Sequence, residues 1–193
     1  MTEPSKDTLR YEALKHRDRI QVFGNEDPEA ACALFFNMVK PQPGRAVALY
    51  WPKDREFDPR AILERLLKEG FACALPVMKK GEKLLGFARW RDGDPLEAGP
   101  FGIQQPALDG KTEWLEPDIV IVPLLAFDRK GYRLGYGSGY YDATLRALRQ
   151  KKEIIAVGVG FAQQAVLFNL PVEDHDEKLD WVITPQKAHF FGD

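Results

Sequence analysis

The chain has 193 residues, 45% hydrophobic and 29% charged, so it carries enough apolar side chain to bury a core and does not have the composition of a disordered chain. Its 27 Lys and Arg against 29 Asp and Glu leave a net charge of −2, which excludes bulk electrostatic attraction to nucleic acid or to an anionic membrane. Two cysteines cannot build a disulfide framework, no apolar run approaches the ~20 residues of a membrane span, and the N-terminal segment has no apolar signal core. We therefore expect a cytoplasmic protein.

The first predicted element is a helix over residues 5–23, with Ser5 as its N-cap. Lys6, Arg10 and Arg17 fall at i, i+4 and i+11, which places them on one helix face. By itself, this stripe is typical of a solvated surface.

The remaining elements follow from apolar runs, caps and breakers. In chain order we expect a helix over 29–39 after Asp27-Pro28, a strand over 46–51, a helix from Asp58-Pro59 to Gly70, a strand over 71–77, a turn at 79–82 into a hairpin strand over 84–90, a strand over 119–122, a helix over 139–150, a strand over 154–160, a helical turn over 162–168 and a strand over 181–184.

This alternation of short, continuously apolar strands with helices predicts an α/β fold. We expect residues 1–193 to form a single three-layer domain, with a mostly parallel central sheet, helices on both faces and the hairpin as an extension. Residues 91–118 hold four Gly and four Pro with little periodicity, so we expect a long loop of the kind that serves a site or a lid.

The segment from Pro123 to Asp142 leaves a buried strand, passes four glycines and enters a helix. A glycine-rich turn at a helix N-terminus exposes backbone N–H groups that cradle phosphate. Arg133, expected on an exposed loop, would add a bidentate donor, and Asp142 could hold a divalent cation. A dinucleotide fingerprint would need Gly where Tyr140 stands, and Gly-Lys-Ser/Thr is absent. On the glycines alone, tight packing of strand on helix explains the segment equally well.

The order of residues in this segment is more specific. Ala126-Phe127-Asp128 is followed by Gly131-Tyr-Arg133-Leu134-Gly135-Tyr-Gly137-Ser-Gly139-Tyr140-Tyr141-Asp142, which closely resembles the signature of the 5-formyltetrahydrofolate cyclo-ligase (5,10-methenyltetrahydrofolate synthetase) family. The likeness extends over most of the chain, through Lys6 and Arg10, Tyr50-Trp51 and Glu56, the segment 102–106, and Asp180.

The resemblance implies an enzyme that uses ATP and Mg²⁺ to cyclise 5-formyltetrahydrofolate to 5,10-methenyltetrahydrofolate, releasing ADP and phosphate through a phosphorylated N5-formyl (iminium phosphate) intermediate. Carried over residue by residue, it implies ATP contacts from Lys6, Arg10, Arg133, Leu134, Gly135, Tyr136, Gly137, Ser138, Gly139, Tyr140 and Tyr141. Folate contacts would come from Trp51, Glu56, Tyr136, Gly137, Ser138, Gly139 and Tyr140. The catalytic residues would be Arg133, Lys6 and Arg10, and the metal ligands Asp142 and Asp180.

The chain departs from that pattern at two positions: Tyr136 and Ser138 stand where some members carry Arg and Lys. The acidic run 173–180 also offers several carboxylates in place of Asp180. The three histidines share no metal-ligand spacing, and we expect Cys32 and Cys73 to be buried and inert.

Two other functional classes remain open. One is a non-catalytic or differently reactive nucleotide-binding protein on the same scaffold. The other, a nucleic-acid binder, has only the stripe of the first helix in its favour, and the net charge opposes it. We expect a monomer with small-molecule partners only, because the sequence shows no heptad or exposed apolar stripe.

Overall fold

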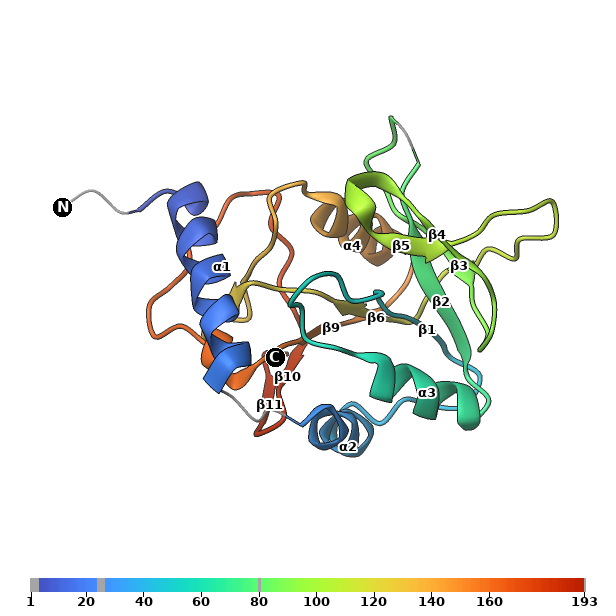
Figure 1. Cartoon of the computed structure of the whole chain (residues 1–193), viewed down its shortest axis with the longest axis horizontal. Coiled ribbons are helices and arrows are strands. Elements are labelled where there is room, and N and C mark those ends of the chain that lie inside the picture. The colour runs from blue at the N-terminus through green and yellow to red at the C-terminus, as the bar shows by residue number, and fades with distance from the viewer. Residues whose placement is uncertain (1–3, 24–26, 80, 193) are drawn as a thin grey trace.

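A seven-stranded sheet in the order β11-β10-β9-β6-β1-β2-β3 forms the centre of the computed structural model, which describes residues 4–23, 27–79 and 81–192 (Figure 1). The inner strands all run parallel: β1 (Ala46–Ala48), β2 (Ala72–Val77), β6 (Ile119–Val122), β9 (Ile155–Val159) and β10 (Trp181–Ile183). Two antiparallel strands, β3 (Gly86–Arg89) and β11 (Ala188–Phe190), close the edges. The expected mostly parallel sheet with a hairpin extension is therefore confirmed.

Helices cover both faces of this sheet, as the apolar strands require. On one face lie α2 (Pro28–Met38) and α3 (Arg60–Lys68), whose Phe35 and Leu66 share a buried cluster with Val47 and Ile121. On the other lies α4 (Tyr140–Lys151), which packs Leu145 against the sheet. Alternate residues of one strand enter opposite clusters, which confirms the three layers.

Local signals explain where these helices begin and end. Asp27 caps α2 by accepting a hydrogen bond from the backbone N–H of Glu29 at 2.9 Å, and Pro28 occupies the first turn. Gly70 ends α3 in the left-handed conformation, φ +84°, and its N–H donates to the carbonyl of Leu67. The helix stop expected at Gly24 and residue Lys80 of the predicted turn lie outside the described residues.

The first helix, α1 (Lys6–Phe23), lies across the end of the sheet rather than on either face (Figure 1). Leu9 and Ala13 pack against a small cluster formed by Ala126, Leu134 and Leu170. The basic stripe on α1 therefore lies beside the glycine-rich segment, and the expectation of a solvated face is wrong for Arg17, which is 4% exposed.

The segment 91–118 contains more structure than the sequence predicts. It holds β4 (Leu96–Ala98), the 3-10 turn η1 (Pro100–Gly102) and β5 (Gln104–Pro106), and β4 and β5 pair antiparallel. The sequence does not predict these strands, because each pairs over only three residues, has little apolar alternation and lies among frequent Gly and Pro.

Other short elements were missed for the same reason. Within the glycine-rich segment, β7 (Ala126–Phe127) pairs with β8 (Arg133–Leu134). The helical turn expected over 162–168 is present but shorter, because η2 covers only Ala162–Gln164. Among the described residues, no helix combines the length and the apolar character needed to cross a membrane.

Candidate functional site

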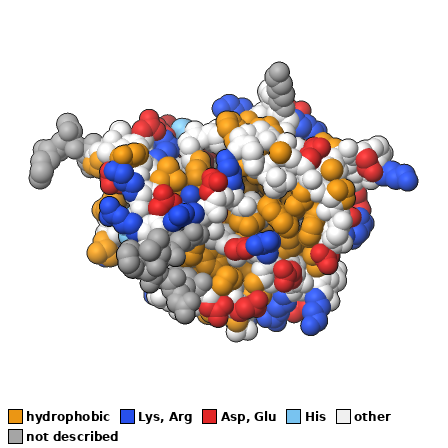
Figure 2. Space-filling view, viewed as in Figure 1, with side chains coloured by type: hydrophobic (Ala, Val, Ile, Leu, Met, Phe, Trp, Pro, Cys, Tyr) orange, Lys and Arg blue, Asp and Glu red, His pale blue; other side chains and the backbone are white. Residues whose placement is uncertain are grey.

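The strand order creates a crevice at one end of the sheet. Among the parallel strands the order is β2-β1-β6-β9-β10, so β1 and β6 are neighbours, but the chain leaves them toward opposite faces, to α3 and to α4. Diverging connections leave a ligand crevice beyond the carboxyl ends of the two strands. A cavity of about 460 Å³ lies there, lined by Tyr50 and Trp51 after β1 and by Pro123 after β6. Figure 2 shows hydrophobic side chains in the hollowed middle of this face, with charged groups around them.

The cavity gathers nearly all the residues predicted from the sequence. From α1 and the segment after β1 come Lys6, Arg10, Trp51 and Glu56. From the glycine-rich segment and the start of α4 come Arg133, Leu134, Gly135, Tyr136, Gly137, Ser138, Gly139, Tyr140, Tyr141 and Asp142. Asp180 alone among the predicted residues does not line it.

The glycine-rich segment lies directly against α1. Gly137 and Gly139 have positive φ, +93° and +72°, which L side chains rarely adopt. A Cβ on Gly137 would lie 3.2 Å from Cζ of Arg10, and Nε of Arg10 donates to the carbonyl oxygen of Gly135 at 3.1 Å. Gly139 begins α4 without a side-chain cap, so the N–H groups of the first turn remain available to an anion.

Lys6 is held by two carboxylates at the edge of the cavity. Its Nζ lies 2.6 Å from Oε2 of Glu173 and 2.6 Å from Oδ2 of Asp176. Desolvation would lower the pKa of Lys6, but the hydrogen bonds and charges of Asp176 and Glu173 outweigh it and raise that pKa above its ordinary value. Lys6 is therefore a permanent cation beside the glycine-rich loop.

Arg133 is buried, which corrects the expectation of an exposed loop side chain. Its side chain is 4% exposed, and Nη2 pairs with Oδ1 of Asp142 at 3.0 Å. Nη1 donates to the carbonyl oxygen of Glu177 at 3.1 Å, and the N–H of Glu177 donates to Oδ1 of Asp142 at 3.0 Å. Arg133 thus joins the glycine-rich loop, α4 and the segment before β10.

A buried chain of polar groups crosses the cavity wall from α1 to the segment after β1. Nη1 of Arg17 donates to the hydroxyl oxygen of Tyr136, and that hydroxyl faces the carboxylate of Glu56. Oε2 of Glu56 also accepts from the backbone N–H of Lys53 at 2.8 Å. Burial raises the pKa of Glu56, while the bonds from Lys53 and Tyr136 and the charge of Arg17 oppose the rise. No pattern in the sequence assigns Arg17 a role beyond the helix stripe, and only its i+11 spacing from Lys6 could have suggested one.

Asp180 does not reach the cavity, so its proposed place as a metal ligand needs correction. Its Oδ2 accepts from the N–H of Ala156 at 2.7 Å and from Arg149 at 3.1 Å, and this joins β9 to the start of β10. The carboxylate that the acidic run brings to the cavity belongs to Asp176.

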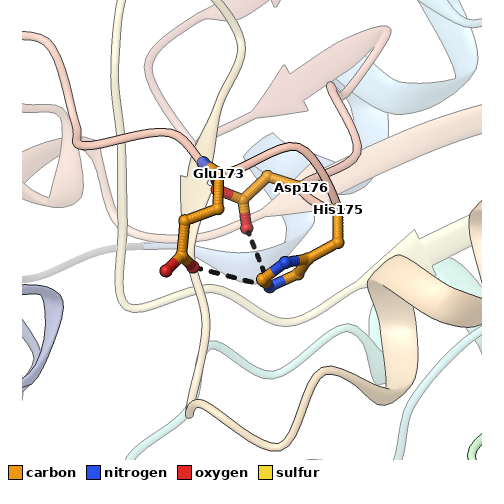
Figure 3. A group of neighbouring side chains, drawn as sticks. All are labelled: Glu173, His175 and Asp176. Carbon is orange, nitrogen blue, oxygen red and sulfur yellow. Dashed lines mark hydrogen bonds and ion pairs between the residues drawn. The ribbon is translucent and has the colours of Figure 1, made fainter.

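Asp176 lies in a cluster with Glu173 and His175, all from one turn (Figure 3). Nε2 of His175 is 3.5 Å from Glu173 and 3.9 Å from Asp176, and the imidazole is 63% exposed. Lys6 pairs with both carboxylates of this cluster, and the three groups together keep one net negative charge.

Aromatic side chains form the apolar part of the wall. Trp51 packs edge-on against the buried Trp90, with ring centroids 5.6 Å apart. Phe101 lines the cavity but is 68% exposed, with φ +59°, and its carbonyl oxygen accepts from Nζ of Lys53. The cavity therefore offers a flat apolar wall and an exposed ring at its edge.

The two cysteines are free and buried, as expected. Desolvation raises the pKa of Cys73 to about 12 and also raises that of Cys32. A thiol that stays protonated is neither a nucleophile nor a metal ligand.

Comparison with known proteins gives consistent matches. A model of the 5-formyltetrahydrofolate cyclo-ligase family matches residues 2–185. A 5-formyltetrahydrofolate cyclo-ligase of Haemophilus influenzae is 32% identical over 183 residues, covering 93% of this chain and 97% of the relative, and that of Mycolicibacterium smegmatis is 33% identical, covering 97% of each. The solved structure of Aquifex aeolicus 5,10-methenyltetrahydrofolate synthetase superposes with a TM-score of 0.74 at 29% identity, covering 97% of this chain and 93% of that one.

Proposed function

The chain belongs to the 5-formyltetrahydrofolate cyclo-ligase family, and from that premise we propose that the cavity between β1 and β6 is where its reaction takes place. The protein is an enzyme, a carbon–nitrogen cyclo-ligase that converts 5-formyltetrahydrofolate to 5,10-methenyltetrahydrofolate. The single observation that supports this site best is the meeting of Glu56, the α1 residues Lys6 and Arg10 and the glycine-rich loop around one cavity.

The folate ring is assigned to the side of the cavity formed by Trp51 and Glu56. A pterin is flat and presents N–H donors, for which the carboxylate of Glu56 is an acceptor. Trp51 and Tyr140 offer aromatic faces to the ring, and the loop residues Tyr136 to Gly139 complete the assigned folate contacts.

ATP is assigned to the opposite side, against the glycine-rich loop and α1. The uncapped N-terminus of α4 and the cations of Lys6 and Arg10 suit a polyphosphate. Arg133 acts from behind the loop, because its guanidinium is already bound to Asp142 and to the carbonyl of Glu177. Its role is therefore to hold the loop and the start of α4 in place, with its charge acting over a distance.

A magnesium ion fits the carboxylates that line the cavity. Oδ1 of Asp142 is occupied by Arg133 and the N–H of Glu177, and no described residue binds its Oδ2. Asp176 provides a second oxygen donor on the cavity wall. These two side chains would hold the ion, which supplies charge neutralisation on the phosphates when bound.

The reaction needs no protein nucleophile, since the substrates supply both. The formyl oxygen on N5 attacks the γ-phosphorus and ADP leaves. N10 then attacks the formyl carbon, the ring closes, N10 loses its proton and phosphate departs with the former formyl oxygen. The chain orients the two substrates, excludes water and stabilises the negative charge on the transferred group through Lys6, Arg10 and the loop N–H groups.

The test is a turnover assay with site variants. Protein, Mg-ATP and 5-formyltetrahydrofolate are mixed and the absorbance of the methenyl product is followed, with each component omitted in turn. We expect product only with all components, and loss of turnover in Arg10→Met but not in the matched control Arg19→Met, which changes an exposed Arg of the same helix. Normal turnover in Arg10→Met would contradict the phosphate assignment.

We also propose that residues 1–193 act as one monomeric, cytoplasmic domain whose only ligands are small molecules. The family match over 2–185 supports a single unit, and the buried free thiols of Cys32 and Cys73 suit a reducing compartment. Gel filtration with light scattering measures the oligomeric state directly.

A further inference from the structure

Arg17 is a buried cation on the wall of the cavity. It is 4% exposed, and its Nε is buried without a hydrogen-bond partner among the residues that the structure describes. Burying an arginine with an unsatisfied donor costs free energy, so its presence here needs an explanation beyond packing.

The contact that Arg17 does make is directed at Tyr136. Nη1 donates to the hydroxyl oxygen, and Cζ lies 5.6 Å from the centre of the ring. A guanidinium has no acceptor, so the hydroxyl must accept from Arg17, and its own hydrogen is left for another group.

That group is the carboxylate of Glu56, which faces the hydroxyl of Tyr136 on the wall of the cavity and interacts with it electrostatically. Tyr136 is 45% exposed at the cavity, while its hydroxyl is bound to the buried Arg17. The N–H of Lys53 donates to Oε2 of Glu56, and the hydroxyl of Tyr136 faces the same carboxylate. A carboxylate offers about four lone-pair positions, so room remains for a ligand.

We propose that Arg17 is a positioning residue that acts through Tyr136 to hold the carboxylate of Glu56 as the hydrogen-bond acceptor for the folate ring. This inference rests on the proposed folate contact of Glu56. It assigns to α1 a part on the folate side of the cavity as well as on the phosphate side.

The charges around Glu56 show what Arg17 contributes. Facing it are the phenols of Tyr50, Tyr136 and Tyr141, the carboxylate of Asp54 on its own segment, and the guanidinium of Arg17. Among these groups, Arg17 is the cation that lowers the pKa of Glu56 against desolvation. Without Arg17 the pKa of Glu56 rises further, so the ionised carboxylate, which is the hydrogen-bond acceptor, is lost at a higher pH.

The experiment measures the Kd of 5-formyltetrahydrofolate without ATP, across pH, for the whole chain and its variants. Arg17→Met keeps the apolar stem and removes the charge, and Arg17→Lys returns a cation. We expect Arg17→Met to raise Kd about tenfold near neutral pH and to move the acid midpoint of binding up by about one pH unit. Arg17→Lys should partly reverse both changes. The control Arg19→Met should change neither the Kd nor the acid midpoint of binding.

A double variant separates positioning from a structural role. If Arg17 acts through Glu56, Arg17→Met combined with Glu56→Gln should bind no more weakly than Glu56→Gln alone. The inference would be overturned if the double variant raised Kd by the product of the two single increases. It would also be overturned if Arg17→Met raised Kd without moving the acid midpoint of binding. If Arg17→Met does not fold, Tyr136→Phe interrupts the same chain of bonds, and an unmoved midpoint there is equally decisive against it.

The outcomes also distinguish this inference from its premise. A normal Kd in Glu56→Gln would overturn the folate contact of Glu56, and the role of Arg17 with it. Weaker folate binding in Glu56→Gln together with a normal Kd in Arg17→Met would overturn only the role of Arg17.

Discussion

Replacing Arg133 tests whether this residue supports the fold as well as the reaction. The side chain is 4% exposed, its partner Asp142 is 20% exposed, and they are 3.0 Å apart. Breaking a buried ion pair costs about 3–5 kcal/mol because one charge is left unpaired. Asp142 retains the N–H of Glu177 and some contact with water, so we expect Arg133→Met to lose about 2–3 kcal/mol of the free energy of unfolding.

The assay is thermal unfolding without ligands. For a chain of this size 1 kcal/mol corresponds to about 2–4 °C, so Tm should fall by about 4–12 °C. The matched control is Arg129→Met, an exposed Arg of the same segment, which should shift Tm by less than about 2 °C.

A second variant tests the reason for the loss. Arg133→Met with Asp142→Asn leaves neither charge unpaired, so it should melt above Arg133→Met alone. A Tm for Arg133→Met equal to that of the Arg129 control would refute the structural role. A double variant less stable than the single one would refute the unpaired charge as the cause.

Three further outcomes are expected. Burial raises the pKa of Glu56, so its ionised form destabilises the fold at high pH. Glu56→Gln should therefore have a Tm at or above that of wild type near pH 8, and the difference in Tm should close as pH falls through the raised pKa. A Tm below that of wild type at pH 8 would contradict this. Asp176→Asn should shift the Mg²⁺ titration of turnover to higher concentration, while Glu173→Gln, at a side chain 56% exposed, should not; identical titrations would exclude Asp176 as a ligand. Gly137→Ala, at φ +93° and with its Cβ 3.2 Å from Arg10, should cost about 1–2 kcal/mol and raise the KM for ATP; unchanged values of both would show that the loop is not held as described.

The sequence by itself determined the layers of the fold and the centre of the site. Buried parallel strands must be apolar on both faces, so Ile119–Val122 is recognisable as a strand wherever it packs. Local rules also found α4, whose start is marked by the glycines before it.

Only the tertiary structure decided which side chains meet. The short pairs β4–β5 and β7–β8 run over only two or three residues in each strand, so no apolar period marks them. Asp176 and Asp180 are both acids of one run, yet the path of the chain gives Asp176 to the cavity and Asp180 to the bond with Ala156. Spacing along α1 places Arg17 on a face, but burial against Tyr136 is a contact across more than 100 residues, and long-range packing of that kind leaves no local pattern in the sequence.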